Sequence, residues 1–274
     1  MKLNLLLGFC FSMALLFVIA CQKDDNSLSN EFVATSEDMT TQQDILEANE
    51  LEITDQIEVG LFELTTRGFP TRTWANPKGS YPNTLTIDYG TSGVTSPNGH
   101  VRKGKIIVQV SAPIKDVGAI RIVSHEDLFI DDVKVEGTVT LTNQGPNSAN
   151  QYVYLRIVSN RLLTFPSGKT ISWNATQILT QLEGGSTPDL KNDDVWSITG
   201  FSNGVNRAGK SFSVSTTESL ISKFTCRWIV QGIINLTVDT NVLSINFGDG
   251  VCNNVAVVTL PDGSTKEVNI RRWW

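Results

Sequence analysis

Histidine, methionine and cysteine are scarce: the 274 residues hold two, three and four of them. The cysteines show neither the CxxC spacing nor the Cys/His pairing that a zinc site needs. No glycine-rich phosphate loop precedes a helical pattern. The longest apolar run, residues 5–20, has 16 residues, which is short of the roughly 20 that a membrane-spanning helix needs. Zinc, nucleotide-phosphate and helical membrane-spanning classes are therefore disfavoured.

The short apolar run is instead typical of an export signal, with an uncleaved membrane anchor as the alternative. Lys2 is the only charged residue before it, and small or aliphatic residues end it. Residues 18–21, VIAC, resemble the lipobox of bacterial lipoproteins. That resemblance implies cleavage of the signal peptide, residues 1–20, and acylation of Cys21. More than one acyl chain at Cys21 would form a durable membrane anchor.

The residues after Cys21 begin with Gln22, Lys23, Asp24 and Asp25. This stretch resembles the tag that sends lipoproteins of Bacteroidota to the outer face of the outer membrane, although a solvated tether would also be polar. We expect an outer-membrane location facing the cell exterior, and a lipidated flexible tether over residues 21–38.

Basic residues are too few to favour nucleic acid as a partner. Without residues 1–20 the chain keeps 21 basic against 28 acidic residues, a net charge of −7. This charge opposes binding to nucleic acid or to an anionic lipid surface. Two cysteines remain besides Cys21, and we expect Cys226 and Cys252 to form a disulfide, with two buried thiols as the alternative.

Two periodicities divide the rest of the chain. In residues 39–66, Leu46, Ile53, Ile57, Leu61 and Leu64 repeat at helical spacing, which predicts an amphipathic helix with one buried stripe. Residues 67–274 alternate apolar and polar residues, which predicts an antiparallel β domain with one dry face. The predicted strands are 84–90, 105–110, 139–143, 152–158, 211–215, 234–238, 242–247, 254–260 and 267–270.

The predicted fold class is all-β, an extended antiparallel sheet preceded by one helix. A sandwich, a rolled sheet and a half-open barrel all fit the pattern. A hairpin that pairs Val238 with Asn241 would bring position 226 near Cys252 if the chain bulges at 248–250. A turn at those glycines would bring the partner from the next strand instead.

Several ordered segments look like an uncharacterised family of Bacteroidota lipoproteins. They include NTLTIDYGTSG (83–93), DDVWSITGFSNGV (193–205), CRWIVQG (226–232) and the GDGxCxN segment at 248–254. The likeness covers roughly residues 80–272. It implies an all-β architecture and an envelope address, and it carries no activity.

Candidate catalytic groups are few. His125 lies between serine and acidic residues, which we interpret as a surface polar cluster, because a triad needs its serine on another element. The pairs Glu126 and Asp127, Asp131 and Asp132, and Asp193 and Asp194 could supply the two carboxylates of a carbohydrate-active hydrolase. Adjacent acids are also common in turns.

Tryptophan gives the clearest indication of binding. Trp74, Trp173 and Trp196 are candidates for stacking on a ligand such as a glycan, although packing within the core is the ordinary role of such residues. We therefore expect a lipid-anchored envelope protein that works as a non-catalytic binding or structural module, without a cofactor or metal. Its expected partners are the membrane and a glycan or another envelope protein, and the alternative function is the hydrolase.

Overall fold

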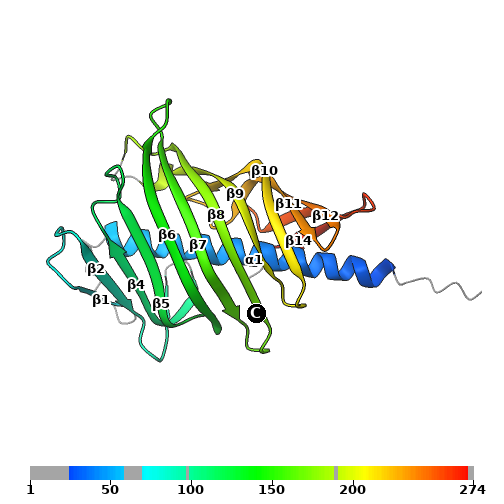
Figure 1. Ribbon diagram of the computed structural model, residues 1–274, viewed down its shortest axis with the longest axis horizontal. Coiled ribbons are helices and arrows are strands. Elements are labelled where there is room, and N and C mark those ends of the chain that lie inside the picture. The colour runs from blue at the N-terminus through cyan, green and yellow to red at the C-terminus, as the bar shows by residue number, and fades with distance from the viewer. Residues whose placement is uncertain (1–24, 59–69, 97–98, 188–190, 271–274) are drawn as a thin grey trace, which may run out of the picture.

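The computed structural model describes residues 25–58, 70–96, 99–187 and 191–270 (Figure 1). A single α-helix of the described chain, α1, covers Asp25–Glu58 and is followed by an antiparallel sheet of 14 strands. The strands are β1 (Thr71–Trp74), β2 (Asn83–Asp88), β3 (Val94–Thr95), β4 (Val101–Val110), β5 (Ile120–Ile130), β6 (Val133–Pro146), β7 (Tyr152–Thr164), β8 (Thr170–Glu183), β9 (Val195–Val205), β10 (Ser211–Lys223), β11 (Ile229–Val238), β12 (Asn241–Asp249), β13 (Val255–Thr259) and β14 (Thr265–Asn269). A 3₁₀ turn, η1, covers Lys191–Asp193.

The sheet is one continuous meander. Apart from β3, which pairs only with β4, each strand lies beside its neighbours in chain order from β1 to β14. The first and last strands do not pair with each other, so the sheet is open. The predicted fold class is confirmed. Of the three arrangements that the sequence left open, the chain forms a single open sheet that is curved around α1 (Figure 1).

Helix α1 lies on the inner face of this sheet and is enclosed by it. The five consecutive residues 38–42 are all buried. Five residues span more than one helical turn of 3.6, so the helix is covered on every side at this point. Figure 1 shows α1 crossing behind the central strands, with its first turns extending beyond the sheet.

The expected boundary between tether and helix is wrong. Residues 25–38 belong to α1, which begins 14 positions before residue 39. Of the expected stripe, Leu46 and Ile53 are buried and Ile57 is half-buried, whereas Leu61 and Leu64 lie outside the described residues. The helix is not amphipathic in the expected sense, since its buried residues also include Asp38, Asn49 and Glu52.

Polar groups hold α1 in this buried position, and an apolar period could not reveal them. The 34 residues of α1 include ten acids and no lysine or arginine. Basic side chains of the sheet region pair with these acids: Lys210 with Glu31, Arg207 with Asp38, Arg156 with Glu47, Arg121 with Glu50 and Arg102 with Glu52. The acidic helix therefore lies against basic side chains of the sheet, three of which are the buried arginines Arg102, Arg121 and Arg156.

The predicted strands all correspond to strands of the sheet, and the alternating pattern did not reveal β1, β3, β5, β8 and β9. The hairpin prediction is confirmed, since Val238 pairs with Asn241 and the register shifts by one residue before Gln231 reaches Asp249. Cys226 and Cys252 form the expected disulfide, with Cα atoms 5.7 Å apart.

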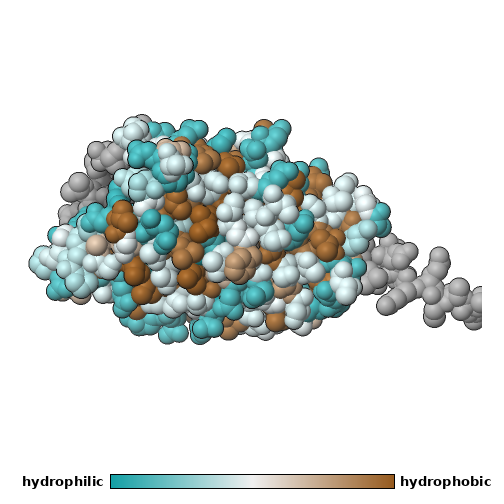
Figure 2. Space-filling model, turned by 45° about the horizontal axis from the view of Figure 1, so that its top comes forward, coloured by the Kyte–Doolittle hydropathy of each residue, from teal (hydrophilic) through white to brown (hydrophobic). Residues whose placement is uncertain are grey.

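The core lies on the inner face and packs against α1. Alternate residues along each strand supply it, as Leu85 and Ile87 of β2 do, because successive side chains of a strand point to opposite faces. The outer face keeps some apolar side chains exposed, including Ile122, Ile157 and Phe201. Threonines separate them in the cross-strand register, so brown and pale residues alternate over the face in Figure 2.

Candidate functional site

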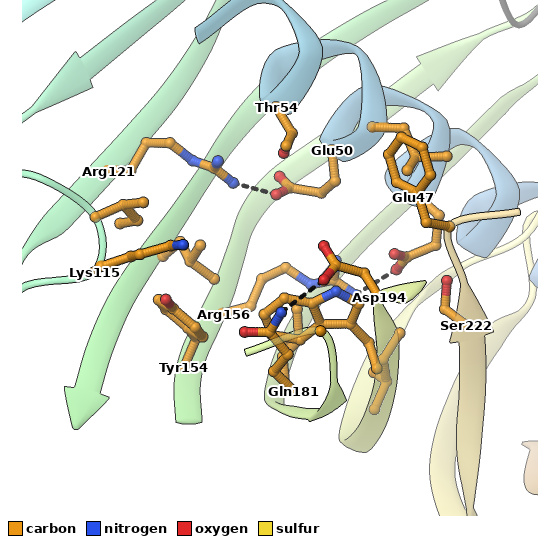
Figure 3. Close-up of a pocket in the computed structure, with 18 residues that line it drawn as sticks. Glu47, Glu50, Thr54, Lys115, Arg121, Tyr154, Arg156, Gln181, Asp194 and Ser222 are labelled. Carbon is orange, nitrogen blue, oxygen red and sulfur yellow. Dashed lines mark hydrogen bonds and ion pairs between the residues drawn. The ribbon is translucent and has the colours of Figure 1, made fainter. Parts of the chain in front are cut away.

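A cavity of about 130 Å³ lies between the C-terminal half of α1 and the inner face of the sheet (Figure 3). We call it the helix pocket. Its lining residues are Glu47, Glu50, Leu51, Thr54, Ile114, Lys115, Arg121, Leu141, Tyr154, Arg156, Leu179, Gln181, Gly184, Asp194, Trp196, Ile198, Ser222 and Phe224. Because these residues come from the helix, six strands and three connecting segments, the pocket forms only when α1 is docked.

Two buried arginines line the sheet side of the pocket. Arg156 on β7 donates through Nη2 to Glu47 Oε1 at 2.7 Å and through Nε to Gln177 Oε1 at 2.9 Å. Arg121 on β5 pairs with Glu50. In both strands the arginine takes an inward position of the alternating pattern, in phase with buried Val123 on β5 and Tyr154 on β7.

Each of these arginines keeps a buried N–H group without a hydrogen-bond acceptor among the described residues. The groups are Nη1 of Arg156 and Nε of Arg121. A buried donor without an acceptor costs about 1–3 kcal/mol. Both arginines line the pocket, and each has one covered N–H group that the folded chain leaves without an acceptor.

Lys115 adds a third positive charge. It lies in the connection between β4 and β5, is half-buried, and points its ammonium group into the pocket (Figure 3). No ion pair joins Lys115 to another residue of the described ranges. In contrast to the two arginines, its charge is not neutralised by a carboxylate of α1.

Aromatic and aliphatic side chains form the rest of the wall. The rings of Tyr154 and Trp196 lie 5.8 Å apart at an interplanar angle of 56°, and Phe224 and Leu179 lie nearby in the lining. Tilted rings at this separation are a favourable packing arrangement. The pocket thus combines an apolar surface suited to a ring with polar groups at defined places.

Asp194 is the acidic group on the side of the pocket away from Lys115 (Figure 3). It is buried, and Gln181 Nε2 donates to its Oδ1 at 2.9 Å. Gly184, with φ of +84°, lies against this carboxylate so closely that a Cβ atom would overlap it. Position 184 therefore requires glycine, because any larger residue would displace the Asp194 carboxylate.

The predicted acid pairs do not assemble a two-carboxylate site. Of the six acids, Asp194 alone lines the helix pocket. The others are engaged elsewhere: Glu126 with Lys105, Asp131 with His100, Asp132 with Lys103, and Asp193 with Thr187, while Asp127 occupies a left-handed backbone position at φ of +46°.

The histidines are also engaged. His125 is not part of a surface polar cluster, because its Nδ1 donates to the Gly137 carbonyl at 3.0 Å and Nη1 of buried Arg161 lies 3.3 Å from the ring nitrogens. Burial and the Arg161 charge lower the pKa of His125 to about 3. His100 bonds Asp131 through Nδ1 and accepts from Arg227 through Nε2 at 3.1 Å, and burial lowers its pKa as well.

The three candidate tryptophans occupy different places. Trp196 lines the helix pocket. Trp173 is buried in the core, and Trp74 on the edge strand β1 is partly buried and packs against the core. Sequence reasoning missed Lys115, Arg121, Tyr154 and Arg156. The inward phase of the two arginines in alternating strands is the signal that could have found them.

Neither a metal cluster nor a membrane-spanning helix occurs in the described ranges. No cluster of three or more His, Cys, Asp or Glu side chains there could hold a metal ion. Nor does any helix in those ranges combine the length and apolarity needed to span a membrane. Comparisons with protein-family models, curated proteins and solved structures found no match to this chain.

Proposed function

We propose that the protein is a lipid-anchored envelope protein that binds a small ligand in the helix pocket and does not transform it. The observation that carries this proposal is the pocket itself: a cavity between α1 and the sheet that combines apolar rings with convergent polar groups. Ligand sites commonly have this composition and lie between elements of secondary structure. Its volume of about 130 Å³ approaches that of an engineered 150 Å³ cavity that binds benzene.

The sequence of the N-terminus supports the anchor. The VIAC motif precedes Cys21, and α1 begins at Asp25, four positions later. Four extended residues span at most about 14 Å. With acyl chains on Cys21, the first turn of α1 would lie close to the bilayer. The acidic residues after Cys21 favour the outer membrane and its external face.

The pairing of the pocket carboxylates supports a binding role over catalysis. Glu47 and Glu50 are each engaged by an arginine, and Asp194 accepts from Gln181. A glycosidase needs one carboxyl group held protonated as an acid and a second one free to act. Because all three pocket carboxylates already have partners within the fold, the hydrolase is the weaker candidate.

Metabolic labelling tests the anchor. Cells supplied with a radioactive fatty acid should label the wild-type chain, and Cys21→Ala should abolish the label. Protease added to intact cells should then degrade the protein. Labelling of the Cys21→Ala chain would contradict the anchor, and resistance to protease until lysis would contradict the external location.

A ligand screen tests the pocket. The soluble chain from residue 22, which retains all of α1, would be screened by ligand-observed NMR against single-ring fragments. Leu51 lines the pocket, so Leu51→Trp should fill it and abolish binding, whereas Val117→Trp places the same ring at an exposed site outside it. Binding that survives Leu51→Trp in a folded protein, or a screen without any hit, would contradict the proposal.

A further inference from the structure

Some charged groups around the helix pocket have partners of opposite charge, and one does not. Two positive and two negative groups cancel as the pairs Arg156 with Glu47 and Arg121 with Glu50. Lys115 points its charge into the cavity without a carboxylate partner among the described residues (Figure 3). The remaining acid, Asp194, lies on the other side and is engaged by Gln181. The Lys115 side of the pocket is therefore positive when the pocket is empty.

The unsatisfied donors lie beside the same wall. Nη1 of Arg156 and Nε of Arg121 lack acceptors, and both arginines line the pocket with Lys115. A carboxylate has two oxygens and about four lone-pair directions, so it can accept from several donors at once. A bound carboxylate near Lys115 would balance the ammonium charge and bring an acceptor toward the guanidinium groups.

The apolar wall defines the rest of the ligand. Tyr154 lies next to Lys115 in Figure 3, and Trp196 packs against Tyr154. A flat ring attached to the carboxylate could therefore contact both aromatic side chains. A cavity of about 130 Å³ has room for roughly one six-membered ring.

We propose that the ligand of the helix pocket is a single-ring carboxylate, with its carboxylate bound by Lys115 beside Arg121 and Arg156 and its ring against Tyr154 and Trp196. This assignment rests on the proposed binding function of the pocket. It names the chemical class that the site selects. A neutral ring would gain only the apolar contacts, and a cationic ring would be repelled by Lys115.

Benzoate and benzamide test the assignment because they share a ring and differ mainly in charge. Both would be titrated into the soluble chain from residue 22 and followed by calorimetry and NMR. We expect benzoate to bind about tenfold more tightly, because its carboxylate pairs with the Lys115 ammonium group and the neutral amide of benzamide does not. Lys115→Met keeps the length of the side chain and should remove this preference. Lys169→Met, at an exposed turn, should retain it.

Each outcome separates the two proposals. Equal binding of both probes, or tighter binding of benzamide, would overturn the carboxylate assignment and leave the binding function standing. A preference for benzoate that persists in Lys115→Met would also overturn it. Binding of neither probe, together with a failed fragment screen, would overturn the binding function itself.

Discussion

Arg156 and Glu47 lie 109 positions apart in the chain, and their side chains meet at 2.7 Å beneath α1. The Arg156 side chain has no exposed surface, whereas the Glu47 side chain keeps 14% of its surface exposed. Because of this difference in exposure, the Arg156 charge needs its partner more than the Glu47 charge does, which water can still solvate. The pair also places both residues in the wall of the helix pocket.

Removing Glu47 should therefore destabilise the fold more than removing Arg156. Glu47→Ala leaves a buried guanidinium without its counter-charge, and breaking a buried pair in this way costs about 3–5 kcal/mol of unfolding free energy. Arg156→Met leaves a carboxylate that water can still reach, so its cost should be smaller. Urea titration measures both, with Asp132→Asn in the exposed pair with Lys103 as the control, expected to cost less than about 1 kcal/mol. Equal losses for Glu47→Ala and Arg156→Met would contradict the asymmetry.

Stability should fall as pH decreases below about 6.5. The pKa of both histidines is lower in the folded chain than the ordinary value of 6.5, reaching about 3 for His125. Below pH 6.5 the histidines of the unfolded chain become protonated, whereas those of the folded chain stay neutral to lower pH. The unfolding free energy therefore decreases by up to about 1.4 kcal/mol per pH unit and per histidine.

Urea midpoints between pH 7 and 5 measure this slope, above the range where carboxyl groups dominate. His125→Gln should clearly reduce the slope, because it removes the histidine whose pKa falls to about 3 in the folded chain. An unchanged slope in that variant would show that His125 does not titrate as its surroundings predict.

Gly137 and Gly263 should respond differently to alanine. Both have positive φ angles, +96° and +83°. A Cβ atom at Gly137 would lie 2.5 Å from the backbone oxygen of Asn160, whereas at Gly263 it would meet no atom within 4 Å. Both variants bear the backbone strain of about 1–2 kcal/mol, and Gly137→Ala alone adds the clash with β7. Thermal unfolding should show a clearly larger loss for Gly137→Ala, and comparable losses would mean that the strands separate there at little cost.

The disulfide should stabilise the fold measurably. Cys226 and Cys252 close a loop with a sequence separation of 26. In the chain-entropy model, cross-linking a loop of this length stabilises the folded state by about 3 kcal/mol. The double variant Cys226→Ala and Cys252→Ala should lose about this amount in urea titration. The same loss on treating the wild type with a reductant, and no effect of reductant on the variant, would tie the change to the bond.

Local periodicity was enough to predict most of the sheet. Strands such as β2 and β12 alternate apolar and polar residues, and the period of two fixes which side chains face the core. The strands that were not predicted have a less regular alternation of apolar and polar residues. In β5, charged residues follow the apolar start, and β9 carries glycines and serines where apolar residues would reveal the period.

The helix was harder to predict because its docking depends on charge. Phe32 is the only buried apolar residue of residues 30–38, and the buried polar residues there have partners such as Arg207 for Asp38 and Asn206 for Thr35. Those partners lie about 170 positions away, so nothing near these residues in the chain signals them. The hydroxyls of Thr35 and Ser36 also donate to carbonyls one turn earlier, which allows such residues inside a buried helix.

The pocket shows the same limit. Trp196 was found because tryptophan is conspicuous in any sequence, but its partners Lys115, Tyr154 and Arg156 resemble ordinary strand and loop residues. Only the pairing of the consecutive strands β5 to β9 under α1 brings them together. Their positive and aromatic groups form a candidate binding site only when the fold brings them together.

By itself, the sequence determined the alternating strands and the hairpin at Val238 and Asn241, because each depends on short-range period and turn geometry. The tertiary structure alone decided that an acidic helix fills the groove of the open sheet and that a pocket forms beneath it. The physical reason is that buried charges are tolerated only beside their counter-charges, and those come from distant parts of the chain.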